Sequence, residues 1–260
     1  MTLSAKVDPA KVAAAWEAGI LEWKLDSNQE ECNRLWHQTR KLARISVCNM
    51  ARQIGKSYWL LVLASEYALQ NPGCQIKYAA QTAKQVRKIL RPHMRDIYRD
   101  CPEHLRPRFH SQDGEYRWPN GSTMTVAGCD RDNAETLRGQ HADLCIVDEG
   151  GALADLSYVV LDILLPQTIN TRGCIIIAST PAPTPGHSFK EFSQRAEEEG
   201  TYLERDIYCN PRISDDEIAE MRRAVGGEDS TTWKREFLVQ HVTDEASAVP
   251  PEAEELFLRK

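Results

Sequence analysis

The chain has 260 residues, of which 42% are hydrophobic and 27% charged, a balance that suits one sizeable α/β domain with an appendage. The formal net charge of −6 excludes binding of nucleic acid through overall positive charge, but not through a local basic patch. The eight cysteines form no C-x-x-C pair and no apolar run approaches 18 residues, so we expect no zinc site, no disulfide framework and no membrane span.

The first elements along the chain are two helices. Asp8 can cap the first helix. Ser27 and Glu30 fit a capping box for the second, which we expect over about residues 28–41. Gln29 lies at the start of that helix, and its amide could read adenine through one donor and one acceptor. An exposed helix glutamine without such a role is the alternative.

The most informative segment is residues 49–57. It follows a strand-like apolar run at 45–48 and opens a helix-like segment at 58–69. A strand, a tight loop and a helix in this order can hold the phosphates of a nucleotide, because the N–H groups of the loop and of the helix N-terminus point at the anion. The segment therefore predicts a nucleotide site at the end of the first strand.

The loop fits the pattern G-x-x-x-x-G-K-[ST] with one departure. Lys56 would reach the β- and γ-phosphates, and the Ser57 hydroxyl would bind Mg²⁺. Gly55 is the second glycine of the pattern, but Met50 stands where the first belongs. A Gly-Lys-Ser tripeptide in an ordinary turn is therefore the alternative, and the rest of a nucleotide site has to be found elsewhere.

The next elements are a strand at 75–80, an amphipathic helix at 82–99 and a hairpin turning at Asn120-Gly121. Pro92 is expected to kink the helix. One side of the helix carries a basic stripe, which could contact DNA phosphates or could simply be a solvated face. The stripe consists of Lys84, Arg87, Lys88, Arg91, Arg95 and Arg99.

A second candidate site element is the apolar run 144–147, which ends in Asp148 and Glu149. Such a run is typical of a strand buried on both faces of a parallel sheet, and its acids would lie at the carboxyl edge, where open α/β sheets bind ligands. Asp148 would hold Mg²⁺, largely through water, and Glu149 would act as general base on the attacking water. A strand end with two solvated acids is the alternative.

A third strand-like run, 173–178, ends in Ser179 and Thr180, which could sense a γ-phosphate or be ordinary turn residues. Strands that alternate with helices predict a mainly parallel sheet with right-handed crossovers. The fold class is therefore α/β, a P-loop NTPase of the ASCE type with helices on both sides of the sheet. We expect the phosphate-loop strand to be central and to neighbour the Asp148–Glu149 strand.

The last part of the chain is acidic and carries no further catalytic constellation. It contains helix-like segments near 188–199, 214–225 and 231–239. We expect residues 1–205 to form the ATPase core with an N-terminal helical extension. Residues 206–260 are expected to form a small lid or linker subdomain.

Together these features resemble the ATPase part of the terminase large subunit, the DNA-packaging motor of tailed phages. Residues 48–57 resemble that family's phosphate loop, which lacks the first glycine and carries Arg-Gln ahead of x-Gly-Lys-[Ser/Thr]. Residues 137–139 with the acid pair are similar to its second block, 178–181 to its coupling motif and 233–237 to a segment near the end of its lid. The resemblance spans about residues 25–245.

The resemblance implies roles for individual residues. Gln29 matches the adenine-contacting position, and Gln53 belongs to the phosphate loop. Arg52 would touch the γ-phosphate within its own subunit. Arg138 is the candidate for an arginine finger supplied to a neighbouring subunit, with Arg131 as the second choice. A structural Arg138 that bonds to loop carbonyls is the alternative.

The resemblance also implies ATP hydrolysis with Mg²⁺ that drives double-stranded DNA into a procapsid. The implied partners are the portal protein, the terminase small subunit and further copies of the chain in a ring, with action in the host cell cytoplasm. The family's complete protein has a C-terminal nuclease, expected to begin about where this chain stops, so we expect ATPase without DNA cleavage. A helicase-like ATPase and a non-catalytic nucleotide-binding assembly module are the rival hypotheses.

Overall fold

An eight-stranded sheet forms the centre of the computed structural model, which describes residues 8–184 and 186–242. The strand order is β3-β4-β5-β2-β6-β7-β1-β8, and every neighbouring pair is parallel except β3–β4 and β4–β5. The strands are β1 (Ile45–Met50), β2 (Gln75–Ala80), β3 (Arg108–His110), β4 (Glu115–Arg117), β5 (Thr123–Gly128), β6 (Leu144–Asp148), β7 (Cys174–Ser179) and β8 (Tyr202–Arg205). The predicted α/β class with a mainly parallel sheet is confirmed.

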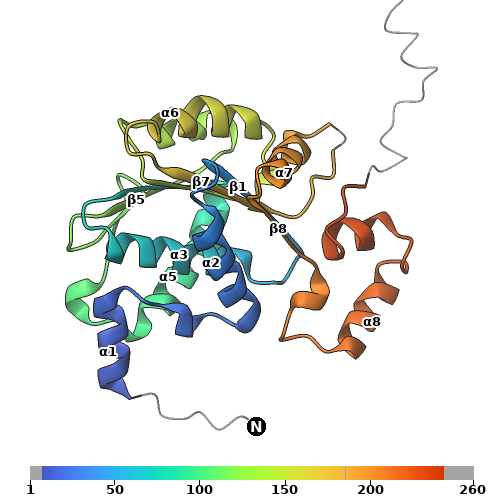
Figure 1. Cartoon of the computed structure of the whole chain (residues 1–260), viewed down its shortest axis with the longest axis horizontal. Helices are drawn as coiled ribbons and strands as arrows, with labels where there is room; N and C mark the ends of the chain where they lie inside the picture. The colour runs from blue at the N-terminus through green and yellow to red at the C-terminus, as the bar shows by residue number, and fades with distance from the viewer. Residues whose placement is uncertain (1–7, 185, 243–260) are drawn as a thin grey trace, which may run out of the picture.

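Helices cover both faces of this sheet (Figure 1). Strand residues alternate between two apolar clusters: Ile146 and Ile176 face one, and Val147 and Ile177 face the other. In Figure 1, α6 and α7 lie on one side of the sheet, and α2, α3 and α5 on the other. The α-helices are α1 (Pro9–Ala18), α2 (Ser27–Thr39), α3 (Lys56–Gln70), α4 (Ala83–Gln85), α5 (Arg91–Ile97), α6 (Leu165–Gln167), α7 (Ser188–Glu198) and α8 (Asp215–Ala224).

The amphipathic helix expected over 82–99 is present as α4, a π-helical segment η2 (Val86–Leu90) and α5, which follow one another directly. Pro92 lies just after the π-helical segment. Its ring cannot donate the usual backbone hydrogen bond, which is one reason for irregular helix geometry here. Two further π-helical segments are η7 (Tyr158–Leu164) and η9 (Trp233–Phe237).

The expected position of the phosphate-loop strand is wrong. β1 is the second strand from one edge, and β7 separates it from β6. Cys48 of β1 and Asp148 of β6 both pair with Ala178 of β7, from opposite sides. All six residues of β7 are buried, as expected for an interior strand of a parallel sheet that is covered on both faces. The inserted strand places Ser179 and Thr180 between the phosphate loop and the acid pair.

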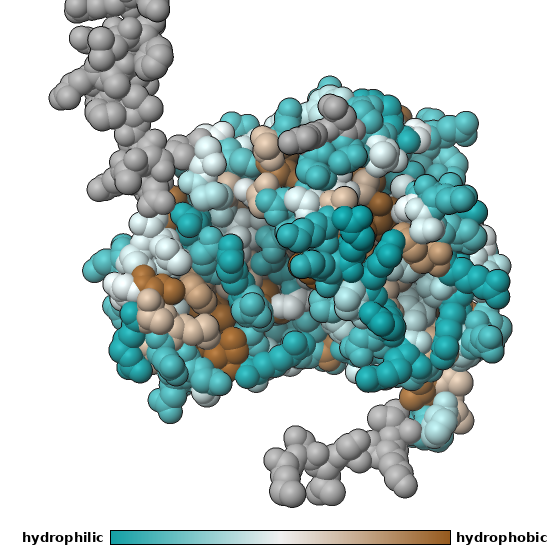
Figure 2. All heavy atoms as spheres, turned by 180° about the vertical axis from the view of Figure 1, so that it is seen from behind, coloured by the Kyte–Doolittle hydropathy of each residue, from teal (hydrophilic) through white to brown (hydrophobic). Residues whose placement is uncertain are grey.

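The C-terminal part of the described chain has a small apolar cluster of its own. Ile207, Ile218, Trp233 and Val239 pack together with Ala51, which directly follows β1. In Figure 1, α8 lies beside the sheet rather than on either of its faces. Seen from behind, the surface is mostly hydrophilic, with hydrophobic residues in small separate patches (Figure 2). In the part of the chain that the structure describes, no helix combines the length and hydrophobicity required to cross a bilayer.

Candidate active site

Three strand ends meet at one cavity of about 810 Å³. Lys56 and Ser57 line it from the start of α3, after the loop that follows β1. Asp148 and Glu149 line it from the end of β6, and Thr180 from just after β7. The carboxyl ends of parallel strands share one edge of the sheet, which is the usual ligand edge in open α/β folds. Candidate residues that lie far apart in the sequence are therefore neighbours in space.

The phosphate loop holds the Lys56 side chain in place. The buried Lys56 Nζ donates to the carbonyl oxygens of Met50, at 3.3 Å, and Ala51, at 3.2 Å. It also lies 3.6 Å from a carboxylate oxygen of Glu149. Gly55, at φ +83°, precedes α3, and a Cβ at this position would lie only 2.3 Å from Gln29 Nε2. A side chain there would be strained by the positive φ and would displace Gln29, so glycine lets the loop reach the helix N-terminus without a side chain in the way.

Gln29 is hydrogen-bonded to this loop and is not among the residues that line the cavity. Its Nε2 donates to the Gly55 carbonyl at 3.0 Å, and its Oε1 accepts from the Asp26 backbone N–H at 3.1 Å. The capping box of α2 is formed by Asp26 and Gln29, so the predicted Ser27–Glu30 box is wrong by one residue. The amide is fully buried and engaged at both ends. An adenine contact would require it to exchange one of these partners.

The Asp148 carboxylate is buried with one oxygen unpaired. The Tyr78 hydroxyl donates to Oδ2 at 2.9 Å, whereas Oδ1 has no hydrogen-bond partner in the described structure. Burial, followed by the charge of Glu149, raises the pKa of Asp148 to about 6, against the opposing effects of Ser57, Tyr78 and Lys56. A carboxylate oxygen that lacks a partner, beside the Ser57 hydroxyl, fits a hard cation such as Mg²⁺. Ser57 and Asp148 are therefore the residues that would hold the metal.

Replacing Asp148 by asparagine is expected to stabilise the ligand-free protein at pH 7.5. The folded-state pKa of about 6 lies above the ordinary value of 3.8, so the ionised form opposes folding above pH 6. Removing this charge should raise the melting temperature by roughly 2–6 °C, with a smaller gain at pH 5, where the aspartate is mostly protonated. Thermal unfolding without metal or nucleotide measures this effect. A variant that is less stable than the unaltered chain at pH 7.5 would show that the burial of Asp148 is not costly.

Glu149 occupies a left-handed backbone conformation, with φ of 57°. Such conformations are uncommon outside glycine and concentrate at functional sites. The turn after Glu149 passes close to the end of β7: the Gly151 N–H donates to the Ser179 hydroxyl at 2.8 Å, and a Cβ on Gly151 would lie 2.5 Å from the Thr180 carbonyl oxygen. Ser179 is fully buried and positions this turn, whereas Thr180 lines the cavity.

Arg235 and Glu236 of η9 are among the cavity residues that were not assigned to the site from the sequence. The Glu236 carboxylate forms an ion pair with Arg52 of the phosphate loop and another with Arg235, at 3.1 Å. The Arg52 backbone N–H also donates to the Glu236 carbonyl at 2.9 Å. Nearby, the Gln53 carbonyl accepts from Asn210 at 2.9 Å. The C-terminal segment thus contacts the phosphate loop directly, and Arg52 and Gln53 both line the cavity.

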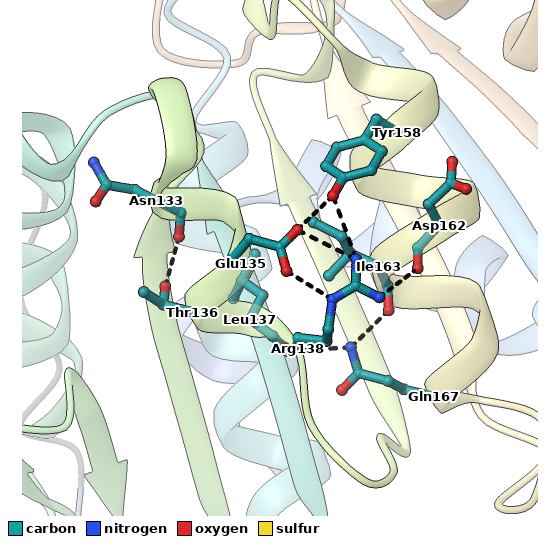
Figure 3. Close-up of polar contacts among 9 residues, drawn as sticks. All are labelled: Asn133, Glu135, Thr136, Leu137, Arg138, Tyr158, Asp162, Ile163 and Gln167. Carbon is teal, nitrogen blue, oxygen red and sulfur yellow. Dashed lines mark hydrogen bonds and ion pairs between the residues drawn. The ribbon is translucent and has the colours of Figure 1, made fainter.

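Arg138 is not among the residues that line this cavity. It lies half-exposed in a surface cluster (Figure 3), where it forms an ion pair with Glu135 at 2.7 Å and donates to the Tyr158 hydroxyl at 3.3 Å and the Asp162 carbonyl at 3.1 Å. Hydrogen bonds from Arg138 and Tyr158 lower the pKa of Glu135 to about 2. The side chain of Arg131 lies outside the described residues. In its own chain, Arg138 therefore contacts a carboxylate, a hydroxyl and one carbonyl of η7, all outside the cavity.

Comparison with known proteins identifies the family. The sequence matches the family described as "Terminase large subunit, T4likevirus-type, N-terminal" over residues 47–253. A sequence search of curated proteins found no match.

The fold is similar to that of the large terminase ATPase domain of Thermus phage P74-26, with a TM-score of 0.60, 20% identity and coverage of 77% of this chain and 89% of that one. It is also similar to the large terminases of bacteriophage HK97 (TM-score 0.67, 15% identity, 83% and 50% covered) and of a thermophilic bacteriophage, the latter in complex with ADP (0.63, 15%, 83% and 53%). The chain spans about half the length of the last two. The family match covers most of the chain and the fold agrees with it, so the chain belongs to the terminase large subunit family and has the fold of its ATPase domain.

Proposed function

We propose that this chain is the ATP-hydrolysing motor domain of a DNA-packaging terminase and couples ATP hydrolysis to the translocation of double-stranded DNA into a procapsid. The observation that carries the proposal is the meeting of Lys56, Asp148 and Glu149 at one cavity. The large terminase of the thermophilic bacteriophage has been solved in complex with ADP and with ATP-γ-S, which supports nucleotide binding by this chain.

The arrangement of charges suits phosphoryl transfer to water. Lys56 and the N–H groups at the start of α3 bind the phosphates. Ser57 and Asp148 would hold Mg²⁺, which would supply further positive charge next to the phosphates. Glu149 pairs with Lys56 at 3.6 Å in the ligand-free structure. A bound triphosphate competes for the Lys56 charge, which leaves the Glu149 carboxylate available to orient and deprotonate the attacking water.

The remaining loop residues complete the nucleotide site. Gly55 and Gln53 contribute the loop backbone, and Gln29 contacts adenine after exchanging one of its present partners. Arg52 leaves Glu236 for the γ-phosphate of its own subunit. Thr180, with Ser179 behind it, reports the state of the γ-phosphate to a lid formed by residues 206–260, while residues 1–205 form the core.

The proposal includes an assembly. Arg138 completes the site of a neighbouring copy in a ring on the procapsid, which contacts the portal protein and the terminase small subunit in the host cell cytoplasm. Arg138 is on the surface and outside its own cavity, as a residue supplied to a neighbour has to be.

Phosphate release from ATP and Mg²⁺, with and without duplex DNA, tests this function. The unaltered chain at high concentration should hydrolyse ATP, and Lys56→Ala should reduce the rate at least about 100-fold, because the phosphates lose their buried cation. Lys41→Ala, which changes an exposed lysine outside the site, is the matched control. Absence of phosphate release would favour a nucleotide-binding assembly module. ATP-dependent strand separation would favour a helicase.

A further inference from the structure

The helix that follows β2 is strongly basic within an acidic chain. Between residues 84 and 108 there are eight lysines and arginines but three aspartates and glutamates, although the whole chain has a net charge of −6. Such a local excess of positive charge marks a surface that attracts polyanions. The excess follows the segment α4–η2–α5 and the loop that leaves it.

Most of the outward-facing basic side chains of this helix are exposed and could contact a ligand. Lys84, Lys88 and Arg95 are exposed, and no ion pair is recorded for them among the described residues. They are four and seven residues apart, so they follow one side of the helix over roughly 16 Å, enough to span several phosphates of one DNA strand. Arg99 is different because it pairs with Asp96 at 3.4 Å. From the six residues of the stripe predicted from the sequence we keep these three, and from here on the basic stripe means Lys84, Lys88 and Arg95 alone.

The other side of the same helix forms a wall of the nucleotide cavity. Gln85, Val86, Ile89 and Leu90 all line it. Three of these four belong to the π-helical segment Val86–Leu90, a geometry that is rare and frequently found at functional sites. One helix therefore presents basic side chains to solvent and apolar side chains to the nucleotide.

Two successive hydrogen bonds connect this helix to the turn that follows Glu149. Gln85 Nε2 donates to Gln81 Oε1 at 2.8 Å, and Gln81 Nε2 donates to the Ala152 carbonyl at 3.2 Å. Ala152 lies in the short helical turn Gly150–Ala152 that directly follows Glu149. Direct contacts thus join the helix to the backbone that follows Glu149.

We propose that the basic stripe binds the phosphate backbone of duplex DNA and that the Gln85–Gln81 contacts couple this binding to the Glu149 turn. The proposal rests on the proposed function, because it assigns a surface to the DNA that the motor moves. Lysine and arginine contacts to phosphates carry no sequence information, so binding is independent of base sequence, as translocation along a genome requires.

The binding surface is tested by Lys84→Gln, Lys88→Gln and Arg95→Gln in one variant, since glutamine keeps a good helix propensity while removing the charge. The matched control changes Lys41, Lys190 and Arg223 to glutamine, exposed residues on other parts of the chain. Fluorescence anisotropy with random-sequence duplex DNA should show an affinity about 10- to 100-fold lower for the stripe variant, with a salt-dependence slope smaller by roughly 2–3. The control should bind like the unaltered chain.

An unaltered affinity and slope in the stripe variant would overturn the assigned surface while leaving the proposed function intact. Failure of the unaltered chain to bind duplex DNA would contradict both. Preference for single-stranded RNA over duplex DNA would overturn the choice of partner. Acetylation of the unaltered chain gives a second readout: bound DNA should protect Lys84 and Lys88 but not Lys41 and Lys190, and equal protection of all four lysines would contradict the proposal.

Coupling is tested separately with Gln85→Ala. The variant should keep its affinity for duplex DNA, because the basic stripe is unchanged, but the ratio of its DNA-stimulated to basal phosphate release should fall towards one. Gln194→Ala, an exposed glutamine on α7, is the control. A Gln85→Ala protein with the full DNA stimulation of the unaltered chain would show that the inner face of the helix does not transmit DNA binding.

Discussion

Replacement of Glu149 by glutamine is expected to reduce ATP turnover by about 10³-fold, within the range usual for loss of a general base, while ATP binding is retained. The amide keeps the shape of the side chain but cannot take a proton from water. The ion pair between Glu149 and Lys56, at 3.6 Å, is lost in this variant, so Lys56 no longer has a carboxylate that competes with the phosphates. Binding of an ATP analogue should therefore be as tight as before or tighter. Phosphate release and equilibrium binding measure the two quantities.

The control for this variant is Glu191→Gln, which removes an exposed carboxylate on α7 and should leave both quantities unchanged. Near-normal hydrolysis by Glu149→Gln would contradict the role of Glu149 as base. A loss of binding together with turnover would instead indicate that Glu149 supports the fold of the phosphate loop, since its backbone is in an uncommon conformation.

Replacement of Arg138 by alanine is expected to reduce turnover of assembled subunits by about 10³-fold or more, because an arginine finger stabilises charge in the transition state. ATP binding by a single chain should be unaffected, since Arg138 does not line its own cavity. Mixing Arg138→Ala subunits with Glu149→Gln subunits gives the decisive result. A neighbour that carries Arg138 can complete the intact cavity of an Arg138→Ala subunit, so two nearly inactive proteins should regain activity together.

Two variants separate this role from a structural one. Arg195→Ala removes an exposed arginine that pairs with Glu199 at 3.1 Å, much as Arg138 pairs with Glu135, and should be active. Glu135→Gln weakens the surface cluster of Figure 3 but keeps Arg138. If Arg138 only holds that cluster together, Glu135→Gln should reproduce the loss and mixing should restore nothing.

Local patterns in the sequence predicted most elements of this fold. The strand at 45–48, the Gly-Lys-Ser turn and the Asn120-Gly121 hairpin can each be recognised from a few consecutive residues. The structure contains all three. The order of the strands was not predictable in the same way. A buried apolar run indicates a strand that is covered on both faces, but not which strands lie beside it, so the place of β7 between β1 and β6 was missed.

For the site, too, residues in local motifs could be predicted from the sequence, whereas contacts between distant segments could not. Lys56, Ser57 and the acid pair follow strands and could be located from short motifs. Glu236 could not, because it meets Arg52 across 184 positions of sequence and no local pattern links the two. For Gln29 the local motif was recognised one residue out of place. Asp26 caps the helix in place of Ser27, so the Gln29 amide becomes part of the capping box.

The most direct test of the account is a crystal structure of the chain with Mg²⁺ and a non-hydrolysable ATP analogue. The account predicts one triphosphate in the cavity of about 810 Å³, with Lys56 Nζ on the β- and γ-phosphates and the metal between Ser57 and Asp148. A triphosphate bound elsewhere, or one that Lys56 contacts while Asp148 and Glu149 remain out of reach, would contradict it.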